Sequence, residues 1–430
     1  MSVITPTHDP EFLSELFLSL KKQTLQQWEW VVVPNGQKKE EIVELLSRFE
    51  DKRIVVKPVP DWHEPIIRGC VGALKSYAFH CAQGDVLVEV DHDDTLHEEC
   101  LRKVAEACEN RDELFVFTRS LVLNENATNE VYHPRYGWDY EVVSYNGRYY
   151  HNPVPFSVSP RSLYEIYWAP NHVRAWTRKA YLRAGGHDPL LPVADDHDLL
   201  CRTYCAGIEF FEIPEVLYYQ RKHKNNTHKH KANEITQATQ RIGEKYLHAM
   251  IQEWCRRQQL PIIQLVTPQT KKLIQEAEFT ISTKTGEVVA LENLHMLTDA
   301  SVGCICATDF LHKIPPGDVA PTINCIYKKL APSGWFVSAT PSTVKEDNTV
   351  NPLALSSLIS RSFWCPHSFR YFTERELAQQ VDGLTCRFQA VRTTIKSVYF
   401  DGNSYEKQPY VFADLLAIKD NQRIPGEIRI

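Results

Sequence analysis

One stretch of the sequence joins an apolar strand to an acidic cluster: Val86-Leu87-Val88-Glu89-Val90-Asp91-His92-Asp93-Asp94. Its first half is typical of a buried β-strand, and three carboxylates follow within four positions. Like charges this close repel each other unless a cation neutralises them, and Mg²⁺ and Mn²⁺ prefer carboxylate oxygens. A solvated acidic turn is the alternative. The position at a strand end favours a divalent metal that holds phosphates.

Length and composition indicate a globular protein of two domains. The chain has 430 residues, 43% of them hydrophobic and 24% charged. The net charge of −6 argues against a general nucleic-acid binder. No apolar run has the length of a membrane span, and the first residues lack the basic and apolar parts of a signal peptide. We therefore expect a cytoplasmic protein without a transmembrane segment, while peripheral membrane contact and oligomeric state stay open.

The cysteines are scattered without a paired framework. The 12 thiols are expected to be reduced, as in a cytoplasmic protein. His197, Cys201 and Cys205 recur every four residues and would share one face of a helix. This spacing suits a zinc site, but no fourth ligand follows at finger-like spacing. A buried helix face with small thiols is the favoured interpretation.

The first half of the chain alternates strands and helices. Strand patterns occupy residues 2–5, 30–33, 53–56 and 85–90, and helical patterns occupy residues 12–24, 41–49 and 71–81. This alternation predicts an α/β domain whose parallel sheet has helices on both faces. Ligands bind beyond the carboxyl ends of such strands. The turn Pro34-Asn35-Gly36 and the acidic cluster both lie at such ends and are expected to converge on one ligand.

A second α/β domain is predicted from Pro261 onward. A long helical pattern runs over residues 232–260, and Pro261 ends it. Strand patterns follow at residues 262–266, 302–306 and 335–339, with a helical stretch at 320–330 between the last two. The predicted organisation is therefore a domain at residues 1–231, a helical linker at 232–260 and a second domain at 261–430.

The first domain resembles the family 2 glycosyltransferases of the GT-A fold, the nucleotide-diphospho-sugar transferases. Blocks similar to the family's motifs follow one another over roughly residues 1–230. They are Ser2-Val3-Ile4-Thr5-Pro6-Thr7, Glu29 through Gly36, Lys75-Ser76 ahead of Ala82-Gln83-Gly84-Asp85, Asp91-His92-Asp93-Asp94, Ala184-Gly185-Gly186-His187-Asp188 with Ala194-Asp195-Asp196-His197-Asp198-Leu199, and Leu217-Tyr218-Tyr219-Gln220-Arg221 with Asn226-Thr227.

The resemblance implies a nucleotide-sugar donor held by a metal. The Mn²⁺ or Mg²⁺ would be held by Asp93 with help from Asp91 and would bridge the diphosphate. Asp94 has three open roles: metal ligand, orienting group or ribose contact. Lys75 would add positive charge near the nucleotide, or it is an exposed helix lysine.

The sequence gives a weaker indication of the nucleobase of the donor. Thr5 and Pro6 would line its pocket, and Asn35 replaces an aspartate that often reads the base in this family. An amide oxygen still accepts from a pyrimidine N3–H. A UDP- or dTDP-sugar is therefore expected ahead of a GDP-sugar.

The resemblance also places the catalytic base. An acceptor hydroxyl must lose its proton as it attacks, and a carboxylate within hydrogen-bond reach is the usual acceptor of that proton. By resemblance this is Asp196, with Asp195 in place of the family's usual glutamate, so the division of roles between the two stays open. Asp198 is expected to anchor the following helix. A single base with direct displacement implies inversion at the anomeric carbon.

Residues 168–176 are expected to recognise the acceptor or the donor sugar. Aromatic faces stack on sugars and polar groups read hydroxyls; the candidates are Trp168, Asn171, His172 and Arg174. The alternative is that Trp168 and Trp176 pack against the sheet. Later in the domain, Arg221 and His223 would approach the diphosphate or the metal, unless they belong to a solvated loop.

The second domain resembles class I methyltransferases, which have a Rossmann-like fold. The resemblance lies in residues 302–315, 326–335 and 368–373 and extends over roughly residues 261–420. The segment Thr267-Pro268-Gln269-Thr270 has no glycine where the family approaches S-adenosylmethionine, and Leu311-His312-Lys313 replaces an expected glutamate. We therefore expect a degenerate domain that lacks S-adenosylmethionine binding.

Three functions remain open from the sequence. The leading hypothesis is an inverting, metal-dependent hexosyltransferase of polysaccharide biosynthesis that acts on a hydroxyl of a glycan. The second adds an O-methyltransferase activity, and the third is a non-catalytic glycan-binding scaffold. A nucleotidyltransferase fits the late Asp-Asp-His-Asp block less well. The sugar, the acceptor and the linkage are not determined by these motifs.

Overall fold

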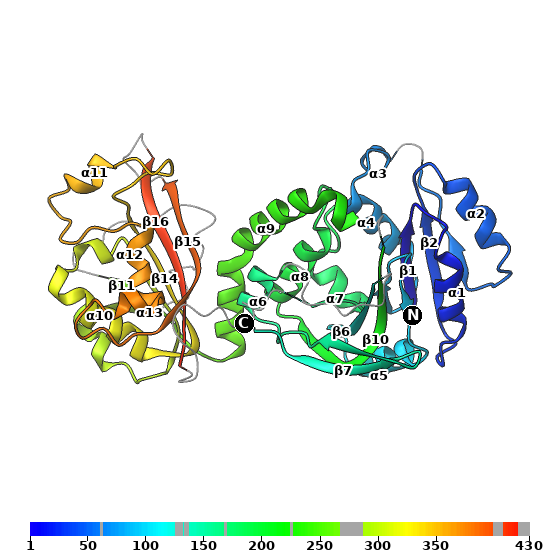
Figure 1. Cartoon of the computed structure of the whole chain (residues 1–430), viewed down its shortest axis with the longest axis horizontal. Coiled ribbons are helices and arrows are strands. Elements are labelled where there is room, and N and C mark those ends of the chain that lie inside the picture. The colour runs from blue at the N-terminus through cyan, green and yellow to red at the C-terminus, as the bar shows by residue number, and fades with distance from the viewer. Residues whose placement is uncertain are drawn as a thin grey trace. The chain divides into compact units, whose positions relative to one another are not determined.

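The computed structural model divides the chain into two compact units, Met1–Tyr246 and Leu247–Ile430 (Figure 1). It describes residues 1–60, 63–124, 132, 137–166, 170–223, 227–266, 287–398 and 407–419. Trp168, Asn226 and the predicted turn at 267–270 lie outside the described residues. The part that it describes contains no helix long and apolar enough to cross a membrane.

The first unit is built on an eight-stranded sheet in the order β3-β2-β1-β4-β9-β6-β10-β5. The strands are β1 Ser2–Thr7, β2 Glu29–Pro34, β3 Ile54–Val56, β4 Val86–Glu89, β5 Thr95–Leu96, β6 Leu114–Asn124, β9 Arg174–Thr177 and β10 Glu209–Lys222. The helices are α1 Leu13–Lys21, α2 Lys39–Ser47, α3 Glu64–Ile67, α4 Val71–Cys81, α5 Cys100–Cys108, α6 Pro160–Glu165, α7 Arg178–Arg183 and α8 Asp195–Cys205. A separate hairpin pairs β7 Tyr140–Tyr145 with β8 Arg148–Pro153.

The central strands form because their residues are apolar on both faces. Residues 30–33 of β2 are fully buried, as expected of a strand with packing above and below. The indole N–H of Trp30 donates to Thr5 Oγ1 at 3.0 Å and joins β2 to β1. Helices α1, α2 and α5 contribute apolar residues to the same core. The carboxyl ends of β1, β2 and β4 therefore lie along one rigid edge.

The sheet is mixed, whereas the sequence predicted a parallel one. Strand β9 is antiparallel to both of its neighbours, β4 and β6, and β5 is antiparallel to β10. After β6 the chain leaves the sheet and forms the β7–β8 hairpin before it returns. It then enters the sheet as β9, which runs in the direction opposite to β4 and β6. Alternation of strands and helices cannot reveal this insertion, because β9 has only four residues.

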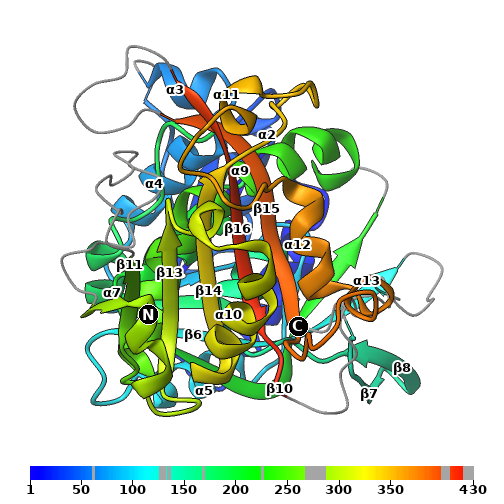
Figure 2. The same ribbon diagram turned by 90° about the vertical axis from the view of Figure 1, so that its left-hand side faces the viewer.

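The second unit contains a six-stranded sheet in the order β12-β11-β13-β14-β16-β15 (Figure 2). The strands are β11 Ile262–Val266, β12 Glu287–Ala290, β13 Val302–Thr308, β14 Leu330–Pro341, β15 Phe388–Val398 and β16 Gln408–Ala417. The helical elements are η2 Leu291–Met296, η3 Leu311–Lys313, α10 Pro316–Lys329, α11 Pro352–Leu355, α12 Pro366–Thr373 and α13 Arg375–Ala378. Strands β11 to β14 are parallel, and β16 is antiparallel to β14 and β15.

A long helix, α9 Thr227–Arg257, covers the boundary between the units along the sequence. Its backbone departs from helical geometry at Lys231. Within the second unit its last turns are tied to the sheet by a buried polar cluster. His248 Nε2 lies 2.9 Å from Asp414 Oδ1, and the guanidinium of Arg392 donates to the same carboxylate.

Candidate active site

The acidic cluster follows β4 at the carboxyl edge of the first sheet, as predicted. Asp94 is buried, and both of its carboxylate oxygens are used within the protein. Tyr218 Oη donates to Oδ2 at 2.7 Å, and the backbone N–H of Arg221 donates to Oδ1 at 2.7 Å. Asp94 therefore orients the loop by joining it to β10.

Asp93 and Asp91 each contact a histidine. His223 Nε2 lies 2.9 Å from Asp93 Oδ2, and the Arg221 guanidinium donates to the Asp93 carbonyl at 3.0 Å. Asp91 is the more exposed of the two, and its Oδ2 lies 3.4 Å from His172 Nε2. The structure therefore places Arg221 and His223 beside the acidic cluster, and their approach to the diphosphate or the metal stays a prediction.

The cluster carries excess negative charge. Burial raises the pKa of Asp94 well above its usual value, and the charges of Asp93 and Asp91 raise it further. Carboxylates in this arrangement bind cations in preference to anions. Among the described residues, no three His, Cys, Asp or Glu side chains are arranged to hold a metal ion by themselves.

The second acidic pair begins helix α8. Ala194, in left-handed backbone with φ of 58°, turns the chain into the helix. Asp196 Oδ2 accepts from Arg174 Nη1 at 2.6 Å, and its Oδ1 accepts from the His197 backbone N–H at 2.8 Å. Burial favours the neutral acid, but the Arg174 guanidinium outweighs it and holds the pKa of Asp196 well below its usual range. Its side chain remains 29% exposed.

Asp195 points into the protein instead. Its side chain is 4% exposed, and its Oδ2 lies 3.6 Å from both Lys75 Nζ and His187 Nε2. This oxygen accepts no hydrogen bond from the residues that the structure describes. Burial raises the pKa of Asp195 to about 7; Lys75 opposes this increase, and the charges of Asp196 and Glu89 add to it. The two neighbouring carboxylates therefore have opposite environments.

Lys75 is buried and is not the exposed helix lysine that the sequence left open. It extends from α4 to form an ion pair with Glu89 on β4 and also faces Asp195. Burial favours the uncharged amine, but the carboxylates of Asp195 and Glu89 outweigh it and raise the pKa of Lys75. Burial likewise opposes the charge on Glu89, but Lys75 and Arg174 lower its pKa to about 2. Glu89 was missed from the sequence, although a charge inside an apolar strand was the available signal.

The predicted base-pocket residues lie at the adjoining strand ends. Pro6 stands opposite Val33 in the β1–β2 register, and Asn35 directly follows β2. Asn35 Nδ2 donates to the Thr7 carbonyl at 3.0 Å. Thr5 is buried, and its hydroxyl accepts from Trp30. The Thr5 hydroxyl is therefore already engaged inside the sheet, and its place in a base pocket stays a prediction.

The segment before β9 contributes inward-facing groups. His172 stacks on Tyr218 with ring centroids 4.8 Å apart, and Asn171 Nδ2 donates to Ser120 Oγ at 3.1 Å. Arg174 is buried and paired with Asp196. Trp176 is fully buried in the core, which is the packing alternative considered for it. The candidate Trp168 lies outside the described residues.

The helix-face thiols are part of α8. His197 and Cys201 are fully buried there, with Cys201 Sγ 3.8 Å from His197 Nε2. Asp198 accepts from Tyr246 Oη at 3.0 Å and from Arg202 Nε at 2.7 Å. This agrees with the expectation that Asp198 anchors its helix.

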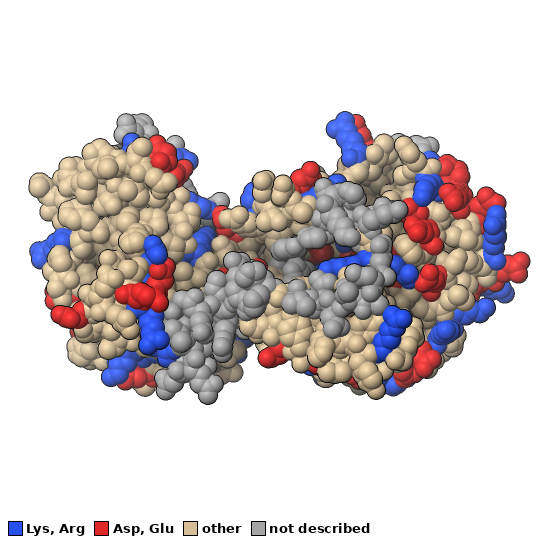
Figure 3. Space-filling view, in the orientation of Figure 1, with Lys and Arg blue, Asp and Glu red and all other residues tan. Residues whose placement is uncertain are grey.

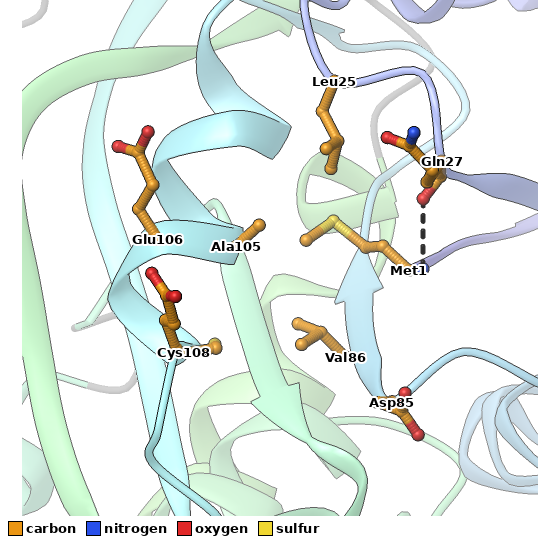
Figure 4. A pocket seen from close by; sticks show the side chains of 9 residues that line it. Met1, Leu25, Gln27, Asp85, Val86, Ala105, Glu106 and Cys108 are labelled. Carbon is orange, nitrogen blue, oxygen red and sulfur yellow. Dashed lines mark hydrogen bonds between the residues drawn. The ribbon is translucent and has the colours of Figure 1, made fainter.

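The first unit also has a cavity of about 420 Å³, whose lining residues (Figure 4) include none of these acids. Its lining includes Met1, Asp85 and Val86, at the amino-terminal ends of β1 and β4. Ligands of open α/β sheets bind at the opposite, carboxyl edge. We therefore place the candidate site at the acidic clusters and not in this cavity.

Residues 2–169 match the model of the family described as Glycosyl transferase family 2. The match includes Lys75 and the Asp91–Asp94 cluster and ends before Arg174 and the Asp195/Asp196 pair. This assigns a glycosyltransferase-type domain to that part of the chain. No curated protein matches the sequence at a significant level.

The chain is also similar to solved structures. TarS of S. aureus in complex with UDP-GlcNAc has 17% identity and a TM-score of 0.42, with 59% of this chain and 72% of that chain covered. The mannosyltransferase PcManGT of Pyrobaculum calidifontis in complex with GDP-Man and Mn²⁺ has 15% identity and a TM-score of 0.36, with 59% and 64% covered. GalNAc-T7 with UDP, GalNAc and Mn²⁺ has 14% identity and a TM-score of 0.39, with 52% and 44% covered.

Proposed function

We propose that the first unit is an inverting, metal-dependent glycosyltransferase that transfers a hexosyl group from a nucleotide diphosphate to a hydroxyl of a glycan. The observation that carries this proposal is the link between the two acidic groups. Glu89 of β4 stands opposite Arg174 of β9 in the sheet, and Arg174 binds Asp196. Asp91, two residues beyond Glu89, is therefore held near the carboxylate at the start of α8.

The donor diphosphate would lie over Asp91 and Asp93. Their oxygens suit Mn²⁺ or Mg²⁺, and His223 adds a nitrogen beside Asp93. Because these residues form no complete protein cage, phosphate oxygens would fill the remaining positions, as is usual for these metals. When bound, the metal would neutralise the charge of the departing diphosphate. A UDP- or dTDP-sugar is proposed ahead of a GDP-sugar on the basis of Asn35.

Asp196 is proposed as the base because an acceptor hydroxyl must be able to reach it. Geometry takes precedence over pKa in choosing a base, and the Asp196 side chain is partly exposed whereas that of Asp195 is buried. The acceptor oxygen would attack the anomeric carbon and give its proton to Asp196. The bond from that carbon to the diphosphate breaks on the opposite face, which inverts the configuration.

Asp195 and Lys75 are proposed to position the base. Their buried contacts fix the first turn of α8 against β4 through Glu89. Lys75, predicted from sequence as a nucleotide contact, is therefore proposed as an internal support. Asn171, His172 and Arg221 remain candidate substrate contacts. His172 lies beside Asp91 and Arg221 beside Asp93, and Asn171 immediately precedes His172.

The test is a calorimetric titration of UDP, dTDP and GDP into the protein, with and without Mn²⁺. We expect one nucleotide to bind only with Mn²⁺ and its binding to disappear in Asp93→Ala. Asp112→Ala, at a carboxylate that is 84% exposed, is the matched control and should bind as the unaltered protein does. If no nucleotide binds under any condition, the enzyme proposal fails and the glycan-binding scaffold takes its place.

For the second unit we propose a methyltransferase-type fold without S-adenosylmethionine binding. The parallel strands β11 to β14 and the antiparallel β16 support the Rossmann-like part of this proposal. At the end of β13, Asp309 already accepts from Tyr410 Oη at 3.0 Å and from Lys313 Nζ at 2.9 Å. We expect no saturable binding of S-adenosylmethionine in calorimetry. Micromolar binding would support the bifunctional alternative instead.

A further inference from the structure

Helix α4 presents one face to the loop at residues 187–194, which leads into the acidic pair of α8. Three residues of α4 recur at intervals of three and four and so share this face: Gly72, Lys75 and Phe79. The centroids of the Phe79 and His187 rings are 4.6 Å apart. Lys75 Nζ lies 3.6 Å from Asp195 Oδ2. The helix therefore contacts the chain at both ends of this loop.

The middle of the loop rests on the first turn of α4. The Gly72 backbone N–H donates to the Leu191 carbonyl at 2.9 Å. The Cys70 thiol donates to the same carbonyl at 3.1 Å and to the Pro189 carbonyl at 3.3 Å. The first N–H groups of a helix have no partner within the helix, so the loop satisfies one of them. Its carbonyl oxygens also lie at the positive end of the helix dipole.

This contact leaves no room for a side chain at position 72. A Cβ atom on Gly72 would overlap the Asp188 carbonyl oxygen and would lie 2.8 Å from the Leu191 carbonyl oxygen. Ordinary van der Waals contact of a Cβ atom begins at 3.4 Å. Glycine is otherwise unfavourable inside a helix, so the close approach of the loop explains its presence here.

The same loop has free space beside it. A cavity of about 360 Å³ lies next to the loop. Its lining includes apolar residues of the loop and of α9: Leu191, Pro192, Val193, Ala238 and Ile242. The loop can therefore shift while the rest of the unit stays folded, and its contact with α4 decides where it lies.

A shift of the loop reaches the acidic pair directly. Three residues separate Leu191 from Asp195, and one of them is Pro192. A chain spans at most about 3.6 Å per residue, and proline fixes its own φ, so this connection absorbs little movement. Figure 3 shows charged side chains at the surface of the first unit, whereas Lys75 and Asp195 meet inside it. A buried pair depends on close geometry.

We propose that Gly72 is a positioning residue for the proposed transfer reaction. The close approach that it allows sets the place of Asp196 relative to the acceptor hydroxyl. Gly72 acts through the loop, while the donor diphosphate is assigned to Asp91 and Asp93 after β4. The inference rests on the proposed role of Asp196 as the base. A displacement of about 1 Å at a catalytic group costs about 100-fold in rate.

The test compares Gly72→Ala with the unaltered full chain. UDP-glucose, dTDP-glucose and GDP-mannose serve as donors, and water takes the place of the glycan. We expect the affinity for the nucleotide with Mn²⁺ to stay within twofold, while release of the nucleoside diphosphate slows about 100-fold. Hydrogen–deuterium exchange should become faster in peptides covering residues 187–199 and stay unchanged in the rest of the first unit.

Gly317→Ala is the matched control. Gly317 is the second residue of α10, as Gly72 is of α4, and a Cβ atom there would meet no atom within 4 Å. Its rate, nucleotide affinity and exchange should equal those of the unaltered chain.

Cys70→Ala is a milder perturbation of the same contact. It removes the thiol donor to Leu191 and adds no atoms. It should slow the release of the nucleoside diphosphate about threefold, and Cys70→Ser, which keeps a donor, should restore the rate. If Gly72→Ala does not fold, an unaltered rate in Cys70→Ala overturns the proposal.

Two results with a folded Gly72→Ala would also overturn it. One is an unaltered rate, and the other is a loss of nucleotide affinity as large as the loss of rate. Faster exchange throughout the first unit would assign Gly72 to overall stability and would likewise contradict the positioning role. If the unaltered chain neither binds a nucleotide nor releases one, the proposed function fails. Faster exchange confined to residues 187–199 would then still support the contact of Gly72 with the loop.

Discussion

Replacing Lys75 with methionine should destabilise the first unit strongly. Lys75 is the buried cation between Glu89 and Asp195, so Lys75→Met leaves Glu89 without its nearest cation. Breaking a buried pair by removing one partner costs about 3–5 kcal/mol. For a unit of this size, such a loss lowers the melting temperature by about 10 °C.

Replacing Glu89 should cost less stability than replacing Lys75, because Lys75 has a second carboxylate partner in Asp195. Glu89→Gln leaves Lys75 beside Asp195, 3.6 Å away, so the buried cation keeps a partner. We expect a loss of about 2 kcal/mol, the value of a charged hydrogen bond. Lys75→Met combined with Glu89→Gln should be more stable than Lys75→Met alone, because the uncompensated charge is gone.

Differential scanning calorimetry of the full chain at neutral pH provides the measurement. Lys179→Met is the control, since Lys179 is exposed and pairs with Asp112 at the surface; its loss should cost about 0.5 kcal/mol or less. If Lys75→Met leaves the melting temperature unchanged but weakens nucleotide binding, Lys75 contacts the donor and the reasoning on its buried role is refuted. Equal losses in Lys75→Met and Glu89→Gln would also contradict it.

Three further outcomes follow from the same site. Asp196→Asn should lower the transfer rate by about 10²–10⁴-fold with nucleotide affinity kept within twofold, as measured by product formation and calorimetry; a rate equal to that of the unaltered protein would exclude Asp196 as the base. Arg174→Met removes the group that lowers the pKa of Asp196, so the acidic limb of the pH–rate profile should move to higher pH; an unmoved limb would argue that another group titrates there. The pKa of Asp195 is about 7 in the folded protein and 3.8 in the unfolded chain, so the free energy of unfolding falls as pH rises between these values. Asp195→Asn should reduce this pH dependence, as measured by urea titrations at several pH values.

The periodic parts of the fold could be read from the sequence. The helix predicted at 71–81 is α4, with the same bounds, and the strand and acidic cluster around Val86 and Asp93 occupy the expected sheet edge. These elements could be predicted because the spacing of apolar residues directly indicates which face of a helix or strand is buried. In the second unit, the strands at 302–306 and 335–339 were found as parts of the longer β13 and β14.

The contacts that give each acid its role could not be read in this way. The orienting role of Asp94 depends on Tyr218, which lies 124 residues further along the chain. The opposite environments of Asp195 and Asp196 depend on Lys75 from α4 and Arg174 from β9, and adjacent positions in sequence do not indicate which side chain turns inward. Antiparallel β9 was missed because four residues carry too little pattern.

The position of β9 also limits how the chain can be divided. The segment that matches the family ends at residue 169, before β9 and β10. In the sheet, β9 lies between β4 and β6, and β10 lies between β6 and β5. A polypeptide cut after residue 169 would therefore have unpaired edges in the middle of its sheet, which favour aggregation. Recombinant expression should yield soluble protein only when the fragment continues through the first unit to Tyr246, so the boundary of sequence similarity is not a boundary of folding.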